Sequence, residues 1–161
     1  MREIYLDNAA TTPMSPKVIN VITDEMKNDF GNASSTYELG RKARNVIDKA
    51  RHQIAESINA KDGEIIFTSG GSESNNTAIF GTAYSRKNSG KKIITTKIEH
   101  PSVLNPMKRL EQEGYNIVYL DVDETGHISL DQLKKELTPD TILVSTMAVN
   151  NEVGSIMPLK E

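Results

Sequence analysis

The pattern of hydrophobic and polar positions divides the chain into a helical first part and an alternating second part. Between residues 36 and 59, seven apolar positions recur at steps of three and four, which predicts a long amphipathic helix with one buried stripe. An earlier helix is predicted from Ser15, a good N-cap followed by Pro16, to about Asp29. Residues 4–7 precede it as a short strand-like segment.

Beyond residue 60, short apolar runs alternate with helical patterns. The runs are typical of strands and lie at 65–68, 93–98, 116–122 and 141–147. Helices are predicted between them, at 72–86, 102–113 and 130–137. This alternation predicts an α/β fold with a mainly parallel sheet of about four strands. We expect residues 1–60 to form an N-terminal segment, and residues 61–161 the first part of a large domain with an incomplete sheet.

Composition and charge narrow the classes of function. The absence of cysteine excludes disulfides, thiolate metal sites and a cysteine nucleophile on this chain. The net charge is −3 and the basic residues form no stripe, so neither nucleic acid nor an anionic membrane is an expected partner. The three histidines share no ligand spacing, so no metal site is expected. No apolar run approaches a membrane span, and the first residues do not resemble a signal peptide, so we expect a cytoplasmic protein.

Three polar clusters follow predicted strands, where parallel sheets bind their ligands. The first, residues 68–76, places Gly70, Gly71 and Ser72 before a helix, an arrangement suited to phosphate. A plain tight turn with a Ser72 cap, and Glu73 facing the helix dipole, explains the same residues equally well. The glycine spacing matches neither a P-loop nor a dinucleotide fingerprint.

The other two clusters are weak signals when taken alone. His100 ends one predicted strand and could stack on a planar ligand or move protons, or it could be a surface histidine before a helix capped by Ser102. The amides of Asn150 and Asn151 could donate to a ligand oxygen, or simply form a turn. Three such clusters on one sheet edge together indicate a binding site.

In order and spacing, these motifs resemble the NifS/IscS-type cysteine desulfurases, which are pyridoxal-phosphate (PLP) enzymes of the class V aminotransferase group and fold type I. The resemblance covers the whole chain and rests on four segments, namely residues 5–13, residues 67–76, Glu99-His100 with Val103-Leu104, and residues 150–154.

Carried over residue by residue, the resemblance implies roles for four positions. Gly71 and Ser72 would hold the PLP phosphate, although the family usually has Ala-Thr there. His100 would stack on the pyridine ring and move protons. Asn151 would bond near the ring oxygen and the substrate. The intact enzyme would convert L-cysteine to L-alanine and an enzyme-bound persulfide, as a homodimer that passes sulfur to an Fe–S scaffold or a tRNA-thiolation enzyme.

The resemblance also implies that this chain lacks part of the machinery. The family's Schiff-base lysine, the aspartate at the pyridine nitrogen, a substrate arginine and the nucleophilic cysteine all match positions beyond residue 161. A helix N-terminus, one stacked ring and one hydrogen bond supply roughly 2–5 kcal/mol, against about 8 kcal/mol for micromolar binding. We therefore expect weak or absent PLP binding, and no turnover, by this chain alone.

Other functions fit the same residues. One is a different class V enzyme, such as a selenocysteine lyase or an aminotransferase. Another is a non-catalytic binding module with the PLP-enzyme fold. A nucleotide-phosphate binder built on Gly70-Gly71-Ser72 ranks below these, because no lysine or magnesium ligand supports it.

Overall fold

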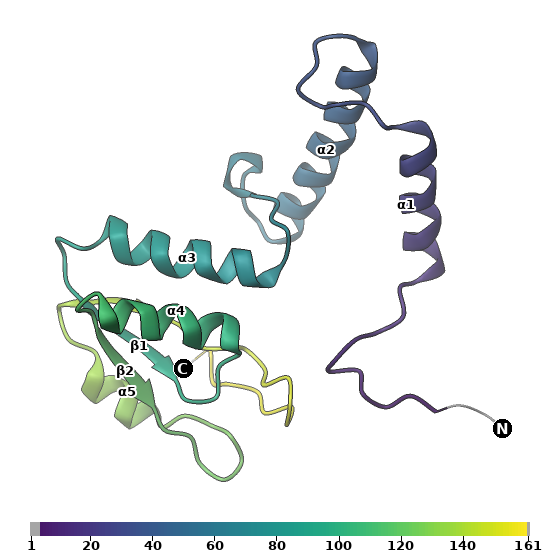
Figure 1. The fold of residues 1–161 in the computed structure, drawn as a ribbon. Helices are drawn as coiled ribbons and strands as arrows, with labels where there is room; N and C mark the ends of the chain where they lie inside the picture. The colour runs from purple at the N-terminus through teal and green to yellow at the C-terminus, as the bar shows by residue number, and fades with distance from the viewer. Residues whose placement is uncertain (1–3, 161) are drawn as a thin grey trace. The chain divides into compact units, whose positions relative to one another are not determined.

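The computed structural model describes residues 4–160, which divide into two compact units on either side of the step from residue 67 to residue 68 (Figure 1). The first unit contains α1 (Pro16–Asn28), α2 (Glu38–Ser57) and a short 3-10 helix (Asp62–Glu64). The second contains three further helices and three strands, namely α3 (Gly71–Ser85), β1 (Lys92–Thr96), α4 (Pro101–Gln112), β2 (Asn116–Leu120), α5 (Leu130–Glu136) and β3 (Thr141–Val144). The predicted domain boundary at residues 60 and 61 stays a prediction.

The two helices of the first unit form where the pattern predicts them. Ser15 caps α1 by accepting a hydrogen bond from the Val18 N–H, with Pro16 at the first helical position. At the other end of α1, Asp29 pairs with Lys42 of α2 at 2.6 Å. Gly40 lets α2 approach the preceding loop, because a Cβ there would lie 2.3 Å from the Ser35 carbonyl oxygen.

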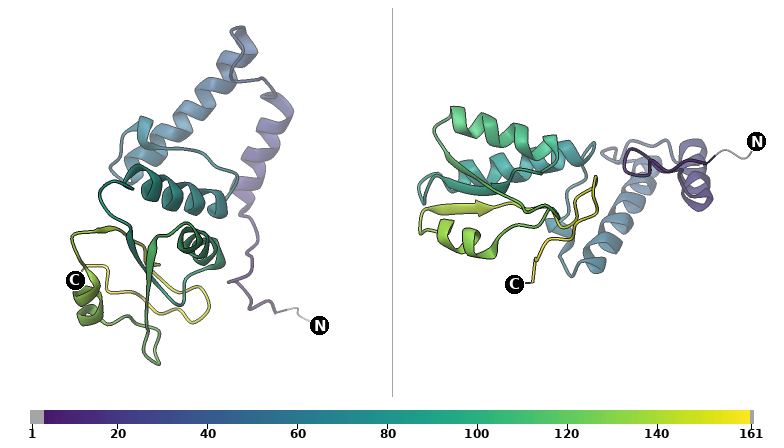
Figure 2. Two further views of the ribbon diagram at one scale, coloured as in Figure 1. Left: turned by 60° about the vertical axis from the view of Figure 1, so that its left-hand side comes forward. Right: turned by 90° about the horizontal axis from the view of Figure 1, so that it is seen from below.

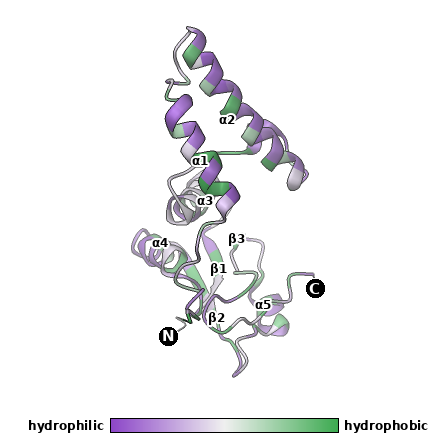
Figure 3. Ribbon diagram, turned by 90° about the vertical axis from the view of Figure 1, so that its right-hand side faces the viewer, coloured by the Kyte–Doolittle hydropathy of each residue, from purple (hydrophilic) through white to green (hydrophobic). Residues whose placement is uncertain are grey.

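The expected buried stripe of α2 is not found. Only Gly40, Ala43 and Ala55 of this helix are buried, whereas larger apolar side chains such as Ile54 remain 42% exposed. Figure 3 shows hydrophobic and hydrophilic residues alternating along α1 and α2. The periodicity predicts the helix correctly, but within its own unit no element covers the apolar face.

Two predicted strands are absent. Residues 4–7 and 65–68 have no hydrogen-bonded strand neighbour in the described part of the chain, and a strand needs one to satisfy its backbone groups. The second segment is instead held by Arg51 of α2, which donates to the Ile65 carbonyl and lies 4.9 Å from the Phe67 ring centroid. The sheet therefore has three strands rather than about four.

The three strands run parallel in the order β2-β1-β3, which confirms the predicted α/β class. Lys92 pairs with Asn116 on one side and with Thr141 on the other, with a register shift after Lys92 on the β3 side. α3 and α4 lie on one face of the sheet and α5 on the opposite face (Figures 1 and 2). Under α3 and α4 lies the core, made of Ile79, Ala83, Ile93, Val103, Met107 and Leu110. All three strands thus direct their carboxyl ends toward one edge.

Tyr119 of β2 should make stability fall at high pH. Burial, and then the hydrogen bond from its hydroxyl to Glu111 at 3.1 Å, raise the pKa of Tyr119 from 10.0 to about 12. Folding therefore favours the neutral phenol. Its contribution is complete below pH 10 and is lost as the pH rises through about 12. Chemical unfolding across this range should show that loss, and Tyr119→Phe should remove it while Tyr37→Phe does not. An unchanged pH profile in Tyr119→Phe would contradict the assignment.

Candidate functional site

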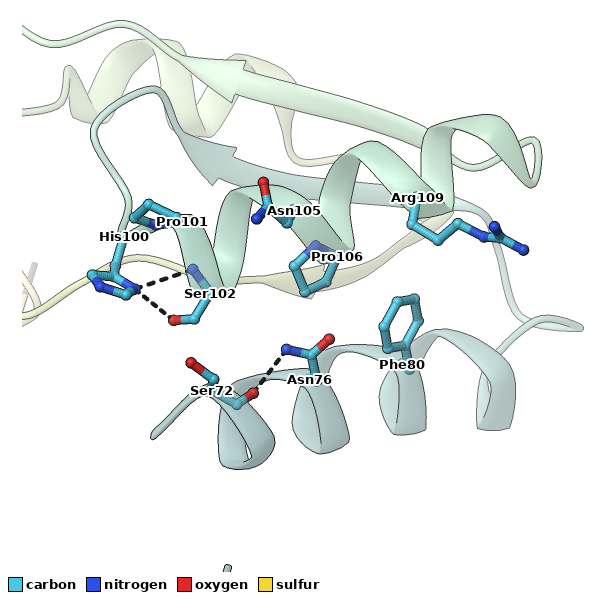
Figure 4. Close-up of a pocket in the computed structure, with 9 residues that line it drawn as sticks. All are labelled: Ser72, Asn76, Phe80, His100, Pro101, Ser102, Asn105, Pro106 and Arg109. Atoms are coloured by element: carbon cyan, nitrogen blue, oxygen red, sulfur yellow. Dashed lines mark hydrogen bonds between the residues drawn. The ribbon is translucent and has the colours of Figure 1, made fainter. Parts of the chain in front are cut away.

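A cavity of about 440 Å³ lies between α3 and α4 (Figure 4). Both helices belong to the second unit, so the cavity lies within that unit. Both also begin at the edge of the sheet where the strands have their carboxyl ends. Its walls are formed by Ser72, Asn76, Phe80, His100, Pro101, Ser102, Asn105, Pro106 and Arg109. The structure therefore places Ser72 and His100, two of the four predicted site residues, on the same cavity.

The N-terminal end of α3 has free hydrogen-bond donors. Gly70, its N-cap, offers no side chain, and among the described residues nothing accepts from the N–H groups of Gly71, Ser72 or Glu73. A Cβ added to Gly70 or Gly71 would have no neighbouring atom within 4 Å. Free N–H groups at the positive end of a helix, beside open space, favour an anion such as phosphate.

The positions of Ser72 and Glu73 do not match the plain-turn interpretation, in which Ser72 caps the helix and Glu73 faces the helix dipole. The helix begins at Gly71, so Ser72 lies in its first turn rather than at the cap, and its side chain lines the cavity. Glu73 turns back to Ser69, accepting hydrogen bonds from its N–H at 2.7 Å and its hydroxyl at 2.6 Å. These bonds, the one from the hydroxyl first, lower the pKa of Glu73. The carboxylate is thus engaged by Ser69, and the first-turn N–H groups stay free.

His100 is the N-cap of α4, a role expected for Ser102. Its Nδ1 accepts a hydrogen bond from the Ser102 N–H at 3.0 Å and lies 2.8 Å from the Ser102 hydroxyl (Figure 4). A backbone N–H can only donate, so Nδ1 is an acceptor and the neutral ring carries its proton on Nε2. The hydroxyl in turn accepts from the amide of Asn75 in α3 at 2.8 Å. The chain of contacts from Asn75 fixes the orientation of the imidazole.

The remaining predicted residues lie outside this cavity wall. Gly71 begins α3 next to Ser72, and Asn151 lies in the exposed turn after β3, where its amide donates to Glu152 at 3.0 Å. The turn is joined to the loop before His100, because the amide of Asn150 donates to the Ile98 carbonyl at 3.3 Å. The cofactor and catalytic roles of Gly71, Ser72, His100 and Asn151 stay predictions.

Asn75 lies in the polar cluster of residues 68–76, but the sequence assigns it no role of its own, and it gives Ser102 only a capping role. Asn75 follows Ser72 by three positions, so both lie on one side of α3, and that spacing was the available signal. Nothing in the sequence showed that this side would face α4.

The described residues contain neither a metal-binding cluster nor a membrane-spanning helix. Among residues 4–160, no group of three or more His, Cys, Asp or Glu side chains could hold a metal ion. Of the helices described here, none is long and apolar enough to cross a membrane.

The sequence profile of one protein family, aminotransferase class-V, matches residues 4–161. The chain belongs to this family. Among class-V relatives, it is 51% identical over 161 residues to a protein named putative cysteine desulfurase IscS 1 from Bacillus subtilis, and 51% identical over 160 residues to the cysteine desulfurase IscS of Dictyoglomus turgidum. The matches cover 100% and 99% of this chain, but 42% and 41% of the relatives. The chain therefore spans about two-fifths of their length.

Solved structures give the same result for this class-V chain. A NifS-like protein is 37% identical, with a TM-score of 0.95, covering 99% of this chain and 44% of that one. A structure described as SspA in complex with cysteine is 39% identical, with a TM-score of 0.89, covering 96% of this chain and 45% of that one. The predicted resemblance to NifS/IscS-type proteins and the fold class are confirmed.

Proposed function

We propose that this chain is the N-terminal part of a PLP-dependent cysteine desulfurase. The observation that carries the proposal is that two features line one cavity. They are Ser72, in the first turn of α3 with its free N–H groups, and the ring of His100, which is oriented by Ser102. Support also comes from relatives named cysteine desulfurase and from a similar structure described in complex with cysteine. In the whole enzyme the substrate is L-cysteine and the product L-alanine, with sulfur left on the enzyme as a persulfide.

The residues present fit PLP. The first-turn N–H groups of α3 and the Ser72 hydroxyl suit a phosphate, and the open space above Gly70 and Gly71 leaves room for it. His100 is exposed, so its ring is accessible to a planar partner. Asn151 supplies an amide donor for a ring oxygen. When bound, PLP supplies an electron sink that stabilises negative charge on the amino-acid carbon.

The chain's own residues would bind the phosphate, hold the ring of His100 in one orientation and transfer a proton. Gly71 and Ser72 would anchor the phosphate through N–H groups that have no acceptor among the described residues. The Ser102 N–H holds His100 by Nδ1, so the proton that this ring would give up is the one on Nε2. Sulfur transfer needs a thiolate, and this chain has no cysteine, so that group must come from elsewhere.

This chain alone should bind PLP only weakly. A helix terminus, one stacked ring and one hydrogen bond supply roughly 2–5 kcal/mol, which corresponds to a Kd of about 0.2 mM or weaker. Equilibrium dialysis with PLP measures it directly, and Ser72→Ala should weaken the binding further while Ser85→Ala does not. A micromolar Kd for the unmodified chain would show that it holds a complete site.

The activity is tested in a chimera in which this chain replaces the matching segment of the D. turgidum IscS relative. At 51% identity the two segments share their fold, and the chimera restores the remaining part of a cysteine desulfurase. We expect it to release alanine from L-cysteine and to form a persulfide. A soluble chimera that releases no alanine, beside an active parent, would contradict the proposed function.

The other enzyme activities are tested on the full-length protein that contains this chain, because the chimera takes its lysine, arginine and cysteine from a desulfurase. Release of selenium from selenocysteine with no reaction of cysteine would identify a lyase for that substrate. Amino transfer to a keto acid without sulfur release would identify an aminotransferase. PLP binding without either reaction would favour the non-catalytic module.

We further propose a cytoplasmic homodimer that passes sulfur to an acceptor protein for Fe–S cluster assembly or tRNA thiolation. Several relatives carry the name IscS, which supports Fe–S assembly. Light scattering of the chimera tests the dimer, and persulfide transfer to a purified Fe–S scaffold protein tests the acceptor. A monomer, or a persulfide that stays on the enzyme, would contradict these parts of the proposal.

A further inference from the structure

Two buried polar side chains join the loop after β1 to the loop after β3. From the first loop, Glu99 accepts a hydrogen bond at 2.8 Å from the N–H of Met147 in the second. From the second loop, Asn150 donates at 3.3 Å to the carbonyl of Ile98 in the first. Each loop thus supplies one side chain that bonds to the backbone of the other.

Both side chains are almost fully buried, Glu99 at 6% and Asn150 at 6% exposure. Each also makes bonds to residues close to it in the chain. Glu99 accepts from the hydroxyl of Thr96 at 2.9 Å, and the Asn150 carbonyl oxygen accepts from the N–H groups of Glu152 and Val153 at 2.9 and 3.0 Å. A buried polar group that loses its partner is destabilised, so these bonds define one arrangement of the two loops.

Their positions in the chain connect this arrangement to the site. Glu99 immediately precedes His100, and Asn150 immediately precedes Asn151. A displacement of either buried side chain therefore moves the backbone from which the next, exposed side chain projects. β1 and β3 are neighbours in the parallel sheet, which places the two loops at the same edge.

We propose that Glu99 and Asn150 are positioning residues that fix His100 and Asn151 relative to each other. The inference rests on the proposed function, because it assigns both loops to one cofactor site. The side chains of Glu99 and Asn150 are almost fully buried and are engaged by the two loops. They act through the backbone of the residue that follows each of them.

The ion pair of Lys92 with Glu136 provides a matched control. It also joins β1 to another element by a largely buried charge, at 3.0 Å, but at the opposite end of the strand. Glu136→Ala should destabilise the fold without moving the loops. A purely structural role for Glu99 would make Glu99→Ala behave in the same way.

The kinetic test uses the chimera. Misplacing a reacting group by about 1 Å can cost about 100-fold in rate, so Glu99→Ala and Asn150→Ala should lower kcat by roughly 10- to 100-fold. Glu99→Gln keeps the acceptor oxygen and should restore kcat to within a few-fold. Glu136→Ala should leave kcat unchanged at a temperature where all variants are folded.

A second readout needs neither cofactor nor activity. Amide hydrogen exchange on this 161-residue chain should show Met147 losing protection in Glu99→Ala, and Glu152 and Val153 losing it in Asn150→Ala. Each substitution should also reduce protection in the opposite loop, whereas Glu136→Ala should not.

The outcomes are distinguishable. An active chimera in which Glu99→Ala and Glu136→Ala have equal kcat contradicts the positioning role alone. Unchanged Met147 exchange in Glu99→Ala also contradicts it. An inactive parent chimera contradicts the proposed function itself.

Discussion

His100→Asn should lower the turnover of the chimera by roughly 100- to 10,000-fold, the range usual for loss of a general acid–base group. Asparagine is among the best N-cap residues, so its side-chain oxygen can accept from the Ser102 N–H as His100 Nδ1 does. The variant therefore keeps the start of α4 intact and removes only the imidazole. Alanine release from L-cysteine, measured over a range of pH, is the readout.

His127→Asn is the matched control for this variant. His127 is a histidine of the same unit that lies outside the cavity, and its Nδ1 contacts the hydroxyl of Thr125 at 2.8 Å. Its replacement should leave turnover unchanged. If His100→Asn folds, binds PLP and retains turnover within a few-fold, the imidazole has no part in proton transfer.

Gly90→Ala should destabilise the second unit by about 3 kcal/mol, the upper end of the range for overpacked sites. Gly90 lies just before β1, and a Cβ there would be 2.1 Å from the carbonyl oxygen of Asp140. That carbonyl also accepts from the Lys92 N–H at 3.2 Å, so it cannot move without disturbing the start of the β1–β3 pairing. Chemical unfolding followed by circular dichroism measures the change.

Gly81→Ala is the same substitution, but it should stabilise the second unit rather than destabilise it. Gly81 lies inside α3, and a Cβ there would meet no atom within 4 Å. Alanine in a helix interior is more stable than glycine by roughly 0.5–1 kcal/mol. Equal changes in both variants would mean that helix propensity and chain flexibility, rather than the contact with Asp140, determine the cost at Gly90.

The sequence pattern predicts the five α-helices of the described residues and the three strands that have neighbours in the sheet. Periodicity predicts α2, and apolar runs predict the three strands of the sheet, although all three strands are shorter than expected. The segment 65–68 has the same apolar character but no neighbour in the described residues. Apolar character indicates that a segment can be buried, whereas a strand also requires another backbone.

The candidate site was predicted in part for the same reason. His100 and Asn151 follow β1 and β3, whose carboxyl ends the parallel topology brings together, whereas Gly71 and Ser72 follow a segment that forms no strand among the described residues and are placed by the start of α3. The cap of α4 was assigned to Ser102 because serine is a good capping residue, but the imidazole of His100 reaches the same N–H group. The contact between Asn75 and Ser102 spans two helices, and single-helix periodicity cannot show it.

The hydrogen bonds between the loops can form only late during synthesis on the ribosome. Asn150 reaches back 52 residues to the carbonyl of Ile98, whereas the Ser102 bonds of His100 lie within two residues. At about 5–20 residues per second, roughly 3–10 s separate the synthesis of these two loops. During that interval His100 can already be capped on its helix, while its backbone has no partner from the later loop. In the nascent chain, the ring of His100 is therefore oriented on its own helix before its backbone is fixed against the later loop.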